Sequence, residues 1–168
     1  MTQKADGQNY APKGKAVPVC SPGEFPVGVI GLDHGHIYGM CNGLSEAGAD
    51  IAWVYDPDGA KVEAFRARFP QVQVARSEAE ILADPAVRLV AAADVPADRC
   101  ATGLRAMDAG KDYFTDKTPM TSLAQLADAR RKVAETGRKY AVYYSERLHV
   151  EAAIYAGDLV KGGAIGRV

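Results

Sequence analysis

The sequence predicts an α/β protein built on a doubly wound, Rossmann-type parallel sheet with helices on both faces. Short apolar, β-branched segments alternate with helical segments along the chain, which indicates parallel strands joined by right-handed helical crossovers. The first apolar run ends in a glycine-containing turn that opens a helix. A content of 48% hydrophobic and 24% charged residues is typical of a globular domain. Ligands of such sheets bind at the carboxyl ends of the strands.

The first strand and its turn, residues 27–40 (VGVIGLDHGHIYGM), predict a phosphate-binding corner. A helix that begins directly after a strand presents unpaired N–H groups to an anion. In the G-x-G-x-x-G pattern, Gly31 fills the first position, whereas Asp33 and His36 replace the second and third glycines. Asp33 could instead cap the helix. We expect the phosphates to lie among the residues of this turn: Gly31, Leu32, Asp33, His34, Gly35 and His36.

Residues 50–55 (DIAWVY) are predicted to form the second strand, and Asp56 follows it. The dinucleotide-binding fingerprint has an acidic residue about 20 residues after its first glycine, where it binds the adenosine ribose. A carboxylate there repels the 2′-phosphate of NADP, so Asp56 favours NAD. The alternative interpretation is a turn aspartate that caps the next helix.

The remaining elements continue the alternation. Strands are predicted at 72–75, 87–93, 112–115 and 139–145, and helices at 37–47, 58–69, 77–82, 96–110, 122–137 and 149–161. Pro96 suits the first position of its helix. The carboxyl ends of strands 87–93 and 112–115 bring further candidate cofactor-binding residues to the same edge of the sheet: Asp94, Pro96, Asp116 and Lys117.

The predicted domain organisation is a flexible arm at 1–26, a dinucleotide-binding domain at 27–147, and a helix with the start of a second domain at 148–168. The net charge of −1 and the scattered basic residues exclude an electrostatic surface for nucleic acid or an anionic membrane. The apolar runs are too short to span a bilayer, and residues 1–26 contain no apolar signal segment. We therefore expect a cytoplasmic protein.

Four segments, VGVIGLDHGH, VYDPD, AGKDYFTDKTPMTS and SERLHVEAA…KGGAIGRV, resemble in this order the Gfo/Idh/MocA oxidoreductases, the family of glucose–fructose oxidoreductase and inositol dehydrogenase. The third segment is the most specific, because Asp116-Lys117-Thr118 stands where the family has Glu-Lys-Pro. The resemblance implies that Lys117 is the catalytic lysine, which lies near the nicotinamide and polarises the reacting hydroxyl.

The resemblance also implies NAD as cofactor, a sugar, cyclitol or related polyol as substrate, and a homo-oligomer as one outcome for the intact protein. In the family, an α+β domain follows the Rossmann domain and covers the substrate. The sequence stops where that domain would begin, so we expect this chain to be inactive alone.

Two alternatives stay open. The chain could be a non-catalytic nucleotide-binding or interaction module, because two glycines of the fingerprint are replaced. Asp33, His34 and His36 could bind a metal ion. We expect no metal site, because the start of a helix directs these three side chains apart.

Overall fold

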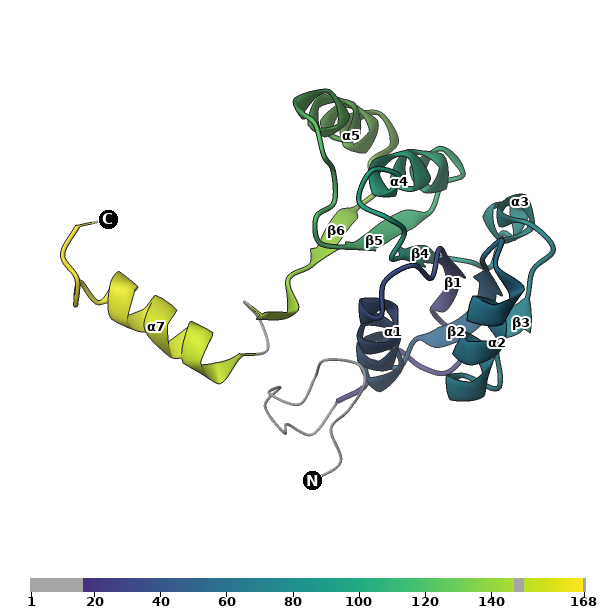
Figure 1. Ribbon diagram of the computed structural model, residues 1–168, viewed down its shortest axis with the longest axis horizontal. Helices are drawn as coiled ribbons and strands as arrows, with labels where there is room; N and C mark the ends of the chain where they lie inside the picture. Colours follow the sequence, from purple (N-terminus) through teal and green to yellow (C-terminus); the bar gives the residue numbers. More distant parts are fainter. Residues whose placement is uncertain (1–16, 147–149, 168) are drawn as a thin grey trace.

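The computed structural model describes residues 17–146 and 150–167. Its centre is an all-parallel sheet with the strand order β3-β2-β1-β4-β5-β6 (Figure 1). This order confirms the predicted doubly wound fold. The strands are β1 (Pro26–Ile30), β2 (Asp50–Tyr55), β3 (Gln73–Val74), β4 (Leu89–Ala92), β5 (Asp112–Asp116) and β6 (Tyr140–Tyr143).

Helices cover both faces of the sheet, with α1 and α2 on one side and α4 and α5 on the other (Figure 1). The described helices are α1 (His36–Glu46), α2 (Gly59–Arg68), α3 (Glu78–Ala83), α4 (Arg99–Asp108), α5 (Leu123–Thr136) and α7 (Glu151–Lys161). No described helix has the length and apolar character needed to cross a membrane.

The core is divided between the two faces because successive strand residues point in opposite directions. Val27 and Val29 pack on the face that α1 and α2 cover, together with Ile37 and Phe65. Ile30 packs on the opposite face, in the second cluster. The buried valines, isoleucines and alanines of β1 and β4 therefore fix these two strands at the middle of the sheet.

The predicted start of α4 at Pro96 is wrong by three residues. Pro96 lies in a turn in which the N–H of Asp98 donates to the carbonyl of Val95 at 3.0 Å. The helix begins at Arg99, and Asp98 is its N-cap residue because its carbonyl accepts the N–H of Thr102 at 3.0 Å. The polar segment after β4 is therefore longer than the sequence suggested.

Helix α7 lies apart from the sheet (Figure 1). Its apolar residues Ile154, Tyr155 and Leu159 are 40%, 66% and 43% exposed. Residues 1–16 of the predicted arm at 1–26 lie outside the described residues. From residue 17 the segment lies against the domain, where the N–H of Val19 donates to the carbonyl of Ala47 at 2.8 Å.

Candidate functional site

The turn after β1 lies where the strand order reverses, between β1 and β4. Gly31 has a φ of 78°, its N–H donates to the carbonyl of Tyr55 at 3.1 Å, and its carbonyl accepts the N–H of Ala93 at the same distance. A Cβ at Gly31 would lie 1.7 Å from Oδ1 of Asp94. The conformation and the space both require glycine here.

Asp56 lies buried at the end of β2 and binds the glycine turn. Its Oδ2 accepts the N–H of Leu32 at 2.7 Å, and its Oδ1 accepts the N–H of Asp58 at 2.8 Å. The cap of α2 is Asp58, whose Oδ1 accepts the N–H of Ala60 at 2.9 Å. Each carboxylate oxygen of Asp56 keeps a second lone pair, so a ribose hydroxyl could still donate to it.

Asp33 does not cap α1, which corrects one interpretation of the sequence. Its carboxylate lies 2.5 Å from Nζ of Lys61 and accepts the N–H of Val95 at 3.3 Å. The N-cap residue of α1 is Gly35, which has no side chain, and the N–H of His36, the first of the helix, donates to Nδ1 of His34 at 3.2 Å. Asp33 therefore does not occupy the start of α1, and an anion that binds there replaces the imidazole of His34 at the N–H of His36.

A cavity of about 480 Å³ lies at the carboxyl ends of β1 and β2, beside Gly31. Two cations line it, Lys61 and Arg105, and Arg105 is paired with Glu78 at 2.5 and 2.9 Å. Carboxylates outnumber them, and these are Asp33, Asp56, Asp58, Glu78, Asp94 and Asp98.

The carboxyl group of Asp94 has a raised pKa of about 6. Burial is the main cause, and the nearby carboxylates of Asp33 and Glu78 raise the pKa further. A hydrogen bond from Thr102 and the charge of Arg105 lower it in part. Among the described residues, no group pairs with its buried Oδ2. Near neutral pH this group is therefore only partly neutral, directly beside the glycine turn.

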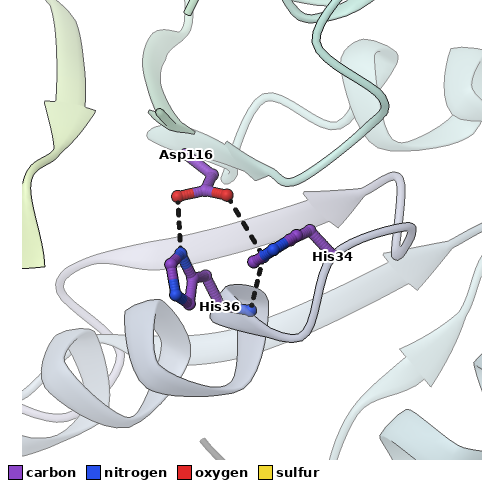
Figure 2. Close-up of side chains that lie close together, drawn as sticks. All are labelled: His34, His36 and Asp116. Carbon is purple, nitrogen blue, oxygen red and sulfur yellow. Dashed lines mark hydrogen bonds and ion pairs between the residues drawn. The ribbon is translucent and has the colours of Figure 1, made fainter. Parts of the chain in front are cut away.

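Figure 2 shows that His34 and His36 both point toward Asp116, the last residue of β5. Nδ1 of His36 lies 2.9 Å from Oδ1 of Asp116, and Nδ1 of His34 lies 3.3 Å from Oδ2. The expectation that these two histidines diverge is wrong, because the turn brings both imidazoles over the neighbouring strand end. Burial lowers the pKa of His34 despite the charge of Asp116.

Arg99 holds the ends of β4 and β5 together, and the sequence analysis missed it. Its side chain is fully buried and paired with the buried carboxylate of Asp116 at 3.2 Å. Its Nε donates to the carbonyl of Asp94 at 2.6 Å, and its Nη1 donates to the carbonyls of Lys117 and Thr118. No motif marks this arginine, because its partners lie up to 19 residues away.

Lys117 lies just beyond β5, where its Nζ donates to Oε1 of Glu146. This hydrogen bond is the main cause that lowers the pKa of Glu146 to about 2. The peptide bond between Lys117 and Thr118 is cis. The lysine side chain is 35% exposed and does not line the cavity beside Gly31.

The predicted site residues thus fall into two neighbouring groups. Gly31, Asp33, Asp56 and Asp94 line the cavity. His34, His36 and Asp116 form the second group, with Lys117 next to it along the chain. The other three line no part of the cavity: Leu32 is buried, and Gly35 and Pro96 are exposed.

Residues 25–144 match the model of the Gfo/Idh/MocA family, described as an oxidoreductase family with an NAD-binding Rossmann fold. The chain belongs to this family. The matched residues include β1, β2, β4 and the Gly31 turn, which are part of the NAD-binding Rossmann fold that the family model describes. No match is found among curated proteins.

Solved structures share the fold of this chain. A candidate oxidoreductase from Erwinia carotovora atroseptica is 47% identical, with a TM-score of 0.80 over 86% of this chain and 43% of its own. Myo-inositol 2-dehydrogenase from Lactobacillus plantarum is 14% identical, with a TM-score of 0.73 over 88% of this chain and 43% of its own. GenD2 of gentamicin A biosynthesis, solved with NAD, is 22% identical, with a TM-score of 0.66 over 77% and 36%. The chain spans less than half of each structure.

Proposed function

We propose that this chain binds NAD at the glycine turn and serves as the cofactor domain of an oxidoreductase that transfers hydride between NAD and a sugar, cyclitol or related polyol. One observation carries the proposal. The Gly31 turn lies at the reversal of strand order and opens α1 at a start that no carboxylate caps, beside a cavity of about 480 Å³. The pyrophosphate would bind at this start of α1.

Asp56 supports NAD over NADP. It lies at the end of β2, lines the cavity and retains acceptor capacity beyond the two backbone N–H groups that it binds. Its charge, with the other carboxylates of the cavity, opposes a further phosphate on the ribose. The structure of GenD2 in complex with NAD is a second support.

Lys117 is our candidate catalytic residue. Its ammonium group would stabilise the alkoxide that develops as a carbinol carbon gives up hydride to the nicotinamide. Its position just beyond β5, held through its carbonyl by Arg99, supports this role. The polyol class is supported by the two inositol dehydrogenases among the structural neighbours.

Calorimetric titration of the full chain with NADH and with NADPH tests the proposal. We expect saturable binding at one site, with NADH bound more tightly. Gly31→Ala should weaken NADH binding at least tenfold, because the new Cβ would meet Asp94 at 1.7 Å. Gly43→Ala is the matched control, since a Cβ there meets nothing within 4 Å and its φ is not positive. Failure of the unchanged chain to bind either nucleotide would contradict the proposal.

A non-catalytic nucleotide-binding or interaction module is the second candidate. The excess of carboxylates in the cavity favours it, because like charges repel a pyrophosphate. As an interaction module it requires that neither nucleotide binds saturably, so the same titrations test it. As a non-catalytic nucleotide-binding module it requires that NADH binds and that no polyol is oxidised, which an assay of NADH formation tests.

A further inference from the structure

The cluster of His34, His36 and Asp116 is built from three separate positions of the fold. His34 lies in the turn after β1, His36 is the first residue of α1, and Asp116 ends β5 (Figure 2). The carboxylate is 1% exposed, and the side chains of His34 and His36 are 52% and 19% exposed. The carboxylate of the cluster is therefore buried, and its His34 side chain faces solvent.

The contact between Nδ1 of His34 and Oδ2 of Asp116 has no proton between the two atoms. The backbone N–H of His36 donates to Nδ1 of His34 at 3.2 Å. An Nδ1 that accepts this hydrogen bond carries no proton of its own. The same atom lies 3.3 Å from Oδ2 of Asp116, so two electron-pair donors face each other. A cation between them would convert a repulsive contact into a favourable one, and the single lone pair of Nδ1 would pass from the N–H of His36 to the cation.

The separations suit a small metal ion. Four-coordinate zinc binds imidazole nitrogen and carboxylate oxygen at about 2.0–2.2 Å, which places tetrahedral ligand atoms roughly 3.3 Å apart. Nδ1 of His36 lies 2.9 Å from Oδ1 of Asp116 and Nδ1 of His34 lies 3.3 Å from Oδ2, so each imidazole faces its own carboxylate oxygen. All three ligand atoms lie within 4.8 Å of one another, and the exposed side chain of His34 has room to adjust.

We propose that His34, His36 and Asp116 bind a divalent transition-metal ion of the zinc type, with the remaining coordination position open toward solvent. Imidazole nitrogen suits zinc, nickel and cobalt better than magnesium or calcium. Arg99 fixes the Asp116 carboxylate from behind at 3.2 Å and offsets part of its charge, so the ion is exchangeable and chelators remove it. The site differs from the Asp33, His34 and His36 set, because Asp33 is paired with Lys61.

The test uses the full, untagged chain after treatment with a chelator, and metal alone as the probe. Zinc binding is measured by calorimetry, and Co²⁺ is added as a spectroscopic reporter of a four-coordinate site. We expect one zinc ion per chain and visible Co²⁺ absorption that zinc displaces. His36→Ala and His34→Ala should each weaken zinc binding at least tenfold, and Asp116→Asn should do the same if circular dichroism shows that it folds.

Asp33→Asn is the matched control, since it removes a neighbouring carboxylate that lies outside the proposed ligand set. It should bind zinc as the unchanged chain does. Absence of zinc binding by the unchanged chain would overturn the proposal, and so would undiminished binding by both folded histidine variants. No nucleotide is present in this experiment, so its outcome is independent of the NAD proposal.

Discussion

Asp94 is the residue whose charge state matters most beside the glycine turn. Its pKa in the folded protein is about 6, against an ordinary value of 3.8. A carboxyl group with a raised pKa stabilises the fold fully below the ordinary value, and this contribution is lost as the pH rises through about 6. Asp94→Asn keeps the shape without the titration.

The expected result is a pH-dependent difference between the two proteins. From pH 4.5 to pH 7, the free energy of unfolding of the unchanged chain should fall by about 2 kcal/mol relative to Asp94→Asn. Urea unfolding at several pH values measures this difference. Asp98→Asn, at an exposed carboxylate of the same segment, should run parallel to the unchanged chain. Parallel behaviour of Asp94→Asn would show that burial does not raise the pKa of Asp94.

Spacing along the chain identifies some residues of the site, whereas the partners of others depend on tertiary packing. Gly31 and Asp56 were found because spacing along the chain identifies them, and both lie at the ends of the expected strands. The partners of Asp33 and Arg99 could not be read from the sequence. Lys61 lies 28 residues from Asp33, and their pairing depends on how α2 packs against the sheet. The same holds for Asp116, which meets His36 across 80 residues.

At the scale of elements, Arg99 joins the start of α4 to the end of β5. Lysine keeps the charge but lacks the planar fork that reaches the Asp116 carboxylate and three carbonyl groups at once. Breaking a buried ion pair costs about 3–5 kcal/mol. Because lysine keeps the charge and loses part of these hydrogen bonds, Arg99→Lys should lower the free energy of unfolding by less than this, on the order of 2 kcal/mol, measured by urea denaturation.

The control for this change is Arg131→Lys in α5. Arg131 forms ion pairs with Asp128 and Glu135, and its side chain is 62% exposed. Exposed pairs of this kind contribute about 0–1 kcal/mol, so the control should stay close to the unchanged chain. Equal stability of the two lysine variants would mean that Arg99 does not hold these elements together.

The order and type of the elements followed from periodicity and capping residues, whereas some boundaries did not. Ser122 caps α5 as expected, with the N–H of Gln125 donating to its Oγ at 3.2 Å. The predicted helix start at Pro96 was wrong because proline is favoured both in turns and at the first position of a helix. Local propensity does not decide between a turn and a helix start at Pro96, because the tertiary contacts of Arg99 and Asp94 make that difference.

At the scale of the whole molecule, the sheet presents two groups of polar residues along one edge, the carboxyl ends of its strands. The cavity beside Gly31 and the cluster at Asp116 lie on neighbouring strand ends. A dinucleotide is long enough to reach from one to the other, with its pyrophosphate at the start of α1.

If NAD binds across these strand ends, it slows amide exchange there, which hydrogen–deuterium exchange with and without saturating NADH measures. We expect slower amide exchange at residues 31–36, after β4 at 94–98, and after β5 at 116–118, with little change in α5. Matched exchange of the chain with NADPH at equal concentration should show weaker protection. Unchanged exchange at residues 31–36, or protection only elsewhere, would mean that NAD does not bind at the Gly31 turn.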